Sequence, residues 1–173
     1  MNKQEIIQKL NENYSAFNSA INTFSDAEFE YSKPEKWSAG QQLKHLVLSV
    51  KPLTQALLLP GFVPKILFGK ANRPSKSFDE LISKYLAKIE AGGKASGSYV
   101  PSVVHIAEKG KLIQSLNTEV QQLTKRLNNI SESDLDVIIL PHPLLGKLTL
   151  REMLYFTIYH AEHHTSSVKK GLL

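Results

Sequence analysis

Residues 103–130 read VVHIAEKGKLIQSLNTEVQQLTKRLNNI. From position 113 onward, apolar side chains recur at steps of three or four residues for more than two heptads. This spacing places them on one face of an α-helix, and a long helix with one apolar face is typical of a helical bundle. The predicted bundle helix runs from about Val103 to Ile130, and its apolar positions are Ile113, Leu116, Val120, Leu123, Leu127 and Ile130.

The two ends of the chain show the same spacing. Near the start, the apolar positions are Ile6, Leu10, Tyr14, Phe17, Ile21 and Phe24. Near the end, they are Leu150, Leu154, Ile158, Ala161, Val168 and Leu172. Thr149 followed three residues later by Glu152 forms a capping box, in which two side chains bond to free backbone N–H groups at a helix start. We therefore expect a first helix over residues 6–24 and a last helix that begins after Thr149.

Capping boxes also predict where two middle helices begin. Ser38 with Gln41 opens a helix whose apolar positions are Leu43, Leu46, Val47, Val50, Leu53 and Leu57. Pro52 lies inside this helix, and its missing N–H predicts a kink. Ser77 with Glu80 opens a shorter helix with apolar positions Leu81, Ile82, Tyr85, Leu86 and Ile89.

The connections between these helices are irregular. Residues 59–77 hold three of the eight prolines and two of the nine glycines, which predicts an irregular crossover that buries Phe62, Ile66 and Phe68. Residues 91–98, AGGKASGS, predict a flexible loop. Its Gly-Gly-Lys is not followed by the Ser or Thr of a phosphate-binding P-loop, so we do not expect it to bind phosphate. A short β-branched stretch and a proline-rich turn precede the last helix.

These elements predict an all-α fold, a four-helix bundle with long crossover connections, in a single domain over residues 1–173. Hydrophobic residues make up 42% and charged residues 21% of the chain, values typical of globular proteins and not of disordered ones. In such bundles the functional site usually lies in the core, between facing helices.

The composition excludes several kinds of site and partner. The chain has no cysteine, so a metal would have to bind His, Asp or Glu, and a cysteine nucleophile is excluded. The formal net charge is +5, but the basic residues are scattered without interleaved aromatics, so we expect no nucleic-acid partner. No run of about 20 apolar residues could span a membrane, and the polar N-terminus does not match a secretory signal. We therefore expect a cytoplasmic protein with no membrane partner.

Three of the six histidines fall within the five residues His160-Ala161-Glu162-His163-His164. On a helix, His160 and His164 point about 40° apart, so both imidazoles can reach one ion. His163 points about 100° away from His164 and furthest from the apolar stripe, which predicts a solvent-exposed surface histidine. The protease pattern HExxH is absent because Ala161 stands at the Glu position, so peptide hydrolysis is not indicated.

A third metal ligand has to come from a facing helix, and His45 is the candidate. It lies near the middle of the helix that opens at Ser38, on a face without charged residues. His105, next to the flexible loop, and His142, in a Pro-His-Pro turn, are weaker candidates. The sequence therefore predicts a metal site at His45, His160 and His164, and histidines with hydrogen-bonded structural roles are the alternative.

Three stretches carry a resemblance to a known family: KWSAGQQLKHL at 36–46, GKLTLREML at 146–154 and YHAEHH at 159–164. In this order they resemble the DinB/YfiT-like metalloenzyme superfamily, and the resemblance spans nearly the whole chain. Members are four-helix bundles in which one His of the first motif and two of a late HxxxH bind a divalent metal. By motif these are His45, His160 and His164. Many relatives carry an acidic residue in the turn before the first His, where this chain has Gln41-Gln42.

The resemblance implies a divalent metal, zinc or nickel first, with iron or manganese as alternatives. Some relatives are S-transferases that use a low-molecular-weight thiol such as bacillithiol or mycothiol. We therefore expect an enzyme that acts on a small-molecule substrate, as a thiol-dependent transferase or a hydrolase; the residues alone do not name a catalytic side chain. The alternative is a non-catalytic helical bundle, for example a binding protein that forms a homodimer, with structural histidines.

Overall fold

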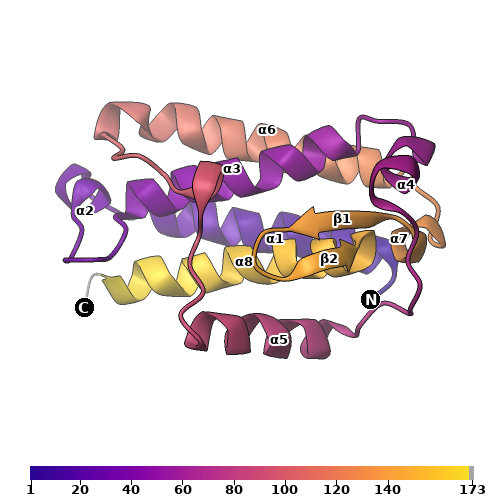
Figure 1. Ribbon diagram of the computed structural model, residues 1–173. Helices are drawn as coiled ribbons and strands as arrows, with labels where there is room; N and C mark the ends of the chain where they lie inside the picture. The colour runs from indigo at the N-terminus through magenta and orange to yellow at the C-terminus, as the bar shows by residue number, and fades with distance from the viewer. Residues whose placement is uncertain (172–173) are drawn as a thin grey trace.

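The computed structural model describes residues 1–171, so the predicted stripe position Leu172 lies outside the described residues. Within them, four long helices form a bundle: α1 (Lys3–Asn22), α3 (Ala39–Ala56), α6 (Lys109–Leu127) and α8 (Leu150–Gly171) (Figure 1). Helix α1 packs against α6 and α8, and α3 packs against the same two helices. This architecture confirms the predicted all-α four-helix bundle, to which the structure adds one small hairpin.

The helices run in pairs, α1 and α8 in one direction and α3 and α6 in the other (Figure 1). Hydrogen bonds at both ends fix the antiparallel pairing of α1 with α6. Lys109 Nζ donates to the carbonyl of Phe24, and Lys3 Nζ donates to that of Ile130. The two parallel helices α3 and α6 are joined by a long crossover. Because α3 and α8 run in opposite directions and pack together, the start of α3 lies towards the end of α8.

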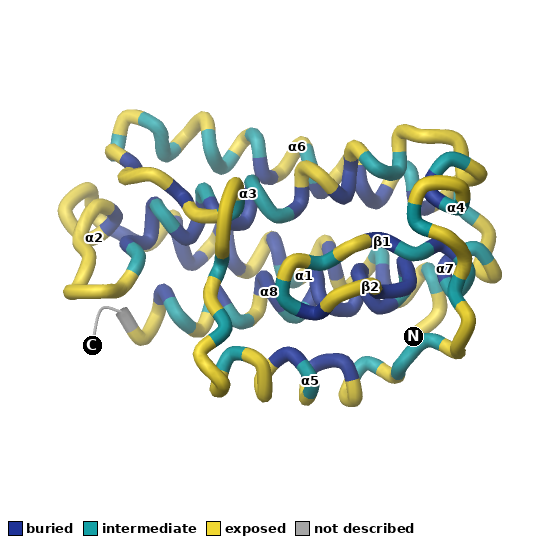
Figure 2. The backbone as a smooth tube through the Cα atoms, in the orientation of Figure 1, coloured by how far each residue is buried: buried dark blue, intermediate teal, exposed yellow. Residues whose placement is uncertain are grey.

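The predicted apolar stripes form the core. Figure 2 shows buried residues along the inner faces of the long helices. Fully buried side chains come from every long helix and include Leu10, Phe17, Leu43, Leu46, Leu116, Leu123 and Leu154. The predicted capping boxes at Ser38 and Ser77 are confirmed, and two further ones, at Asn2 and Ser25, begin α1 and the short helix α2 (Asp26–Glu30).

The crossover after α3 differs from its prediction. It contains a short helix, α4 (Phe62–Phe68), before α5 (Phe78–Glu90) begins at Ser77. Phe62 and Ile66 are 62% and 76% exposed, so the prediction that they are buried is wrong, and Phe68 is only partly buried. The reason is the place of α4 at one end of the bundle, where Pro64 is its only buried residue.

The third bundle helix begins later than predicted. Helix α6 starts at Lys109, and the residues before it form two 3₁₀ turns, η1 (Gly97–Tyr99) and η2 (Ile106–Glu108), joined by extended chain. We call residues 91–108 the strap. In Figure 1 the strap leaves the end of α5 and crosses α8 and α3 before it reaches α6. It carries backbone groups across the bundle to the start of α3.

A hairpin precedes the last helix, where the sequence predicted a short β-branched stretch and a turn but no second strand. After the short helix α7 (Asp134–Val137), the strands β1 (Ile139–His142) and β2 (Gly146–Thr149) pair antiparallel. Gly146 closes the turn with φ of 79°, a conformation that glycine adopts without strain. Within residues 1–171 the structure contains no helix of the length and apolarity required to cross a membrane.

Candidate metal centre

Three histidines from two helices meet in the core of the bundle. Nε2 of His45, on α3, lies 3.1 Å from Nε2 of His160, on α8. Nε2 of His164, one turn further along α8, lies 3.1 Å from the same atom. All three residues are buried, and their candidate ligand atoms lie within 4.8 Å of one another. The structure thus brings together the three residues that the sequence named as metal ligands.

Local sequence explains why these side chains meet. The capping box at Ser38 fixes where α3 begins, which sets the direction of His45. His160 and His164 are four residues apart, so they lie on the same face of α8. Because α3 and α8 pack antiparallel (Figure 1), the first half of α3, which carries His45, lies beside the middle of α8, which carries His160 and His164.

Carbonyl oxygens fix the tautomers of two of the three imidazoles. Nδ1–H of His45 donates to the backbone carbonyl of Tyr99 in the strap, at 2.7 Å. Nδ1–H of His164 donates to Oε1 of Gln42, at 2.9 Å, and the amide of Gln42 donates in turn to the carbonyl of Trp37. Since a carbonyl oxygen can only accept, the proton of each neutral ring lies on Nδ1. The lone pairs of both Nε2 atoms therefore point towards His160.

The three facing Nε2 atoms have too few protons for each lone pair to accept a hydrogen bond. His160 can place at most one proton on its Nε2, and that proton can be donated to one of the other two rings only. At least one buried lone pair is left without a donor in either tautomer of His160, which is costly in a protein interior. A divalent cation would satisfy all three. Two metal–nitrogen bonds of about 2.0–2.1 Å at angles between 90° and 110° separate their nitrogens by about 2.9–3.4 Å, and the 3.1 Å from His160 Nε2 to each of the other two Nε2 atoms lies in this range.

Burial keeps the three imidazoles in the form that binds metals. It lowers the pKa of His45 below the usual value, and a hydrogen bond to Tyr99 only partly offsets this. Burial lowers the pKa values of His160 and His164 well below 6.5, and the neighbouring histidines add to the effect. The rings are therefore neutral at neutral pH, as ligation requires.

The other histidines have different places. His163 is not a member of the cluster, but the prediction that it is a solvent-exposed surface residue is wrong: it is half-buried, with its ring edge-on to Tyr85 at 5.9 Å. The reason is α5, which packs over that side of α8. His105 is exposed, away from the cluster, and lies 3.7 Å from Glu30.

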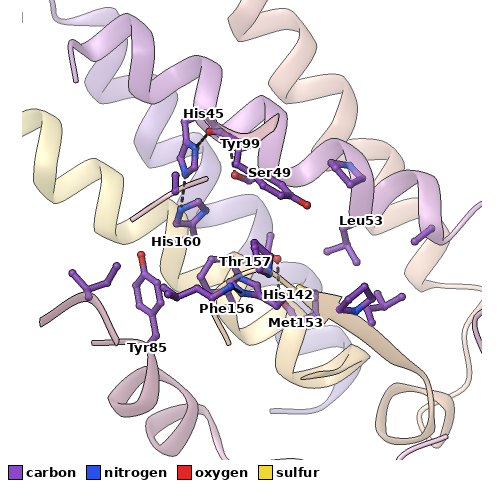
Figure 3. A pocket seen from close by; sticks show the side chains of 18 of the residues that line it. His45, Ser49, Leu53, Tyr85, Tyr99, His142, Met153, Phe156, Thr157 and His160 are labelled. Atoms are coloured by element: carbon purple, nitrogen blue, oxygen red, sulfur yellow. Dashed lines mark hydrogen bonds between the residues drawn. The ribbon is translucent and has the colours of Figure 1, made fainter. Parts of the chain in front are cut away.

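The cluster borders a cavity of about 310 Å³ between α3, α5, α8, the hairpin and the strap. His45 and His160 form part of its wall (Figure 3). The lining is mainly apolar and aromatic, with Phe156 stacked on His160 at a centroid distance of 4.8 Å. Among the described residues that line the cavity, none is Asp or Glu, and Lys94 is the one with a formal charge.

Sequence reasoning missed His142, Gln42 and Tyr99 as neighbours of the site. His142 lines the cavity because the Pro-His-Pro turn belongs to a hairpin that lies over α8, and burial lowers its pKa to about 4. Gln42 lies one turn before His45 on the same face, which is a signal that the sequence contained. Tyr99 acts through its backbone carbonyl, for which side-chain patterns give no signal.

Among the solved structures similar to this chain are YfiT, a conserved protein from Enterococcus faecalis and ClbS. YfiT from Bacillus subtilis, described as a probable metal-dependent hydrolase with an unusual four-helix bundle topology, aligns with a TM-score of 0.64 and 18% identity over 97% of this chain and 84% of its own. A conserved protein from Enterococcus faecalis aligns with a TM-score of 0.64 and 17% identity over 99% and 95%. The colibactin self-resistance protein ClbS, in complex with double-stranded DNA, aligns with a TM-score of 0.58 and 17% identity over 99% and 95%.

At these identities the solved structures establish a shared fold. No curated protein sequence matches the chain. The family model of the DinB superfamily matches residues 9–168, which include all three clustered histidines. The chain therefore belongs to the DinB superfamily.

Proposed function

We propose that this protein is a divalent-metal-dependent enzyme that activates a nucleophile at His45, His160 and His164 and directs it at a small molecule in the adjoining cavity. The observation that carries the proposal is the convergence of three imidazole Nε2 atoms, two of them held unprotonated, in a cluster that borders an apolar cavity. Three protein ligands leave a coordination position for water or substrate, as in catalytic and not in closed structural sites. A bound divalent metal supplies Lewis acidity, which lowers the pKa of a coordinated water or thiol.

The three candidate ligands suit a metal that strongly lowers the pKa of a coordinated water or thiol. All three ligands are neutral imidazoles, so they do not reduce the positive charge of the site as thiolates or carboxylates would. The carbonyl of Tyr99 and the amide oxygen of Gln42 hold two rings in the ligating tautomer. Imidazole nitrogens favour zinc and nickel, and iron or manganese remain alternatives within this proposal.

The lining of the cavity favours a thiol as the nucleophile. Water activated for hydrolysis loses a proton, and no Asp or Glu of the described residues lines the cavity to accept it. A thiol is more acidic than water, so a thiol held by the metal would release its proton to solvent at neutral pH and would need no base in the cavity. Thiol transfer to a small electrophilic molecule, from a low-molecular-weight thiol of the cytoplasm, is therefore our first reaction class. Hydrolysis is the second, and it is supported by the description of YfiT as a probable metal-dependent hydrolase.

Two assays on one preparation test this proposal. Tag-free protein loaded with zinc or nickel is mixed with 1-chloro-2,4-dinitrobenzene and a panel of thiols, or with p-nitrophenyl butyrate alone. Metal-dependent conjugation supports thiol transfer, and metal-dependent ester cleavage without thiol supports hydrolysis. The His160→Ala variant should lose either activity, and His105→Ala, which changes an exposed residue away from the site, should keep it. Metal-loaded protein without either activity, against these and a wider panel of electrophiles and esters, would favour a non-catalytic metal-binding bundle.

A further inference from the structure

His142 ends strand β1, and the turn that follows fixes its tautomer. The backbone N–H groups of Leu144 and Leu145 both donate to Nδ1 of His142, each at 3.1 Å. Two donors can point at one ring nitrogen only if that nitrogen carries a lone pair and no proton. The proton of the neutral imidazole is therefore on Nε2, the opposite of the arrangement at His45 and His164. Nε2 of His142 therefore carries a proton that it can donate, whereas Nε2 of His45 and of His164 carries a lone pair that can bind a metal.

The donor atom of His142 has no protein partner. No group of residues 1–171 accepts a hydrogen bond from Nε2, and this atom is not among the fully buried unpaired ones. The ring lines the cavity and meets the ring of Phe156 edge-on, with centroids 4.3 Å apart. Phe156 in turn stacks on His160, so one aromatic ring separates the donor from the candidate metal centre. Figure 3 shows His142, Phe156 and His160 following one another along the cavity.

The charges around this donor have one sign. Lys94 lines the cavity, and no carboxylate of the described residues lies within ion-pair distance of it. Lys84 Nζ donates to the carbonyl of Leu145, in the same turn that holds His142. With no Asp or Glu in the lining, the cavity offers the N–H donor of His142 and the positive charge of Lys94 within a mainly apolar lining. This combination suits an anionic oxygen on a mainly apolar molecule.

We propose that the substrate carries a carboxylate or a similar oxyanion, that Nε2–H of His142 donates a hydrogen bond to it, and that Lys94 adds its charge at the edge of the cavity. The inference rests on the proposed function in that it names the substrate class of the same cavity. The apolar body of the substrate lies against Phe156, which leads to the candidate metal centre. His142 is then a substrate-binding residue that holds one end of the molecule while the reacting atom lies at the other.

A matched ligand series tests the inference. Octanoate, octan-1-ol and octylamine have the same apolar body and differ in the head group. Titration calorimetry with full-length, chelator-treated protein measures binding to the cavity without a contribution from a metal. We expect octanoate to bind at least about tenfold more tightly than octan-1-ol, and octylamine to bind most weakly. Equal affinities for octanoate and octan-1-ol would overturn the inference.

Two substitutions separate the binding role of His142 from its role in the turn. In His142→Asn, the amide oxygen replaces Nδ1 as acceptor for the turn, as in an Asx turn, and the Nε2–H donor is lost. In His142→Gln, the amide N–H replaces the donor and the acceptor for the turn is lost. We expect His142→Asn to keep the thermal unfolding midpoint and to bind octanoate about tenfold more weakly. His142→Gln should lower the midpoint and bind octanoate more tightly than His142→Asn. Wild-type affinity in His142→Asn would contradict the inference.

A spectroscopic measurement on the unchanged protein covers the case in which both variants unfold. Nitrogen-15 NMR of histidine-labelled protein should show His142 protonated at Nε2, and octanoate should shift the resonance of this nitrogen. An unmoved resonance at saturating octanoate would overturn the inference. Because these measurements use metal-free protein, octanoate binding without metal-dependent activity would refute the proposed function and leave His142 as the anion-binding residue of a ligand-binding cavity. Metal-dependent activity without selectivity for octanoate would do the reverse.

Discussion

Helix α8 carries two buried polar clusters, and they differ in how many of their polar atoms have a hydrogen-bond partner. At its start, Glu152 is fully buried, and its carboxylate accepts two hydrogen bonds from Arg73 and one each from the backbone N–H groups of Lys76 and Thr149. Near its end, the three-histidine cluster has more lone pairs than protons. Unpaired hydrogen-bonding groups therefore distinguish a binding site from a structural cluster. Burial and polarity are common to both clusters, and only the three-histidine cluster lacks a partner.

The largest effect on stability should come from removing the Glu152 carboxylate, whose hydrogen bonds are all made within the protein. Glu152→Ala removes the cap of α8 and leaves the backbone N–H groups of Lys76 and Thr149 without their acceptor, so we expect a loss of about 2–4 kcal/mol in the free energy of unfolding. Urea unfolding followed by circular dichroism measures it. The metal affinity of the folded variant should be unchanged. A loss below about 1 kcal/mol would show that the cluster contributes little to the fold.

Glu152 also predicts a dependence of stability on pH. Burial raises the pKa of its carboxyl, but the hydrogen bonds from Arg73, Lys76 and Thr149 outweigh this and leave the pKa below the usual value. A lowered pKa in the folded state means that the stabilisation is present above about pH 4.3 and is lost as the pH falls through the folded value. Wild-type unfolding midpoints should therefore fall in acid more steeply than those of Glu152→Gln. Parallel curves for the two proteins would contradict the assignment.

A smaller effect, on metal affinity, should come from the residues that orient the imidazoles of the three-histidine cluster. Gln42→Ala removes the acceptor that holds His164, and we expect zinc affinity to fall about 10–100-fold. Gln41→Ala is the matched control, because Gln41 caps α3 through Ser38 and does not contact the histidines. It should cost about 1 kcal/mol of stability and keep the affinity. Competition with a chromogenic chelator measures both variants, and equal affinities would remove Gln42 from the site.

The smallest effect concerns nucleic acid. We expect the protein to bind duplex and single-stranded DNA only weakly, because its net charge of +5 is not gathered in a stripe or around exposed aromatic residues. The expectation matters because ClbS, which shares the fold, was solved in complex with double-stranded DNA. Fluorescence anisotropy at two salt concentrations tests it. Salt-sensitive binding at submicromolar protein concentration would overturn it.

The parts of the fold that could be predicted from sequence are those that depend on local chemistry. The capping boxes at Ser38, Ser77 and Thr149 fix helix starts through contacts three residues apart, and each was found. The pair His160 and His164 follows from helical spacing alone. His45 could be chosen because its helix face lacks charge, and the structure places it against the pair.

The parts that could not be predicted depend on contacts between distant segments. The hairpin depends on the pairing of β1 with β2 over α8. Strand β1 is short and contains a proline, so its local sequence gives only a weak signal for a strand. The carbonyl of Tyr99 reaches His45 only because the strap crosses the bundle. Phe62 and Ile66 look like core residues by composition, but α4 lies where no other element covers them. His142 was placed in a loop for the same reason, since only the packed hairpin brings it to the cavity.

The most direct test of the central claim is the metal content of the tag-free protein and four single variants, measured by inductively coupled plasma mass spectrometry. We expect about one divalent metal ion per chain in the wild type and in His163→Ala. His45→Ala, His160→Ala and His164→Ala should lose the metal and remain helical by circular dichroism, because the apolar core does not depend on it. Metal-free wild-type protein that takes up no zinc or nickel, or loss of metal in His163→Ala with retention in His164→Ala, would contradict the three-histidine site.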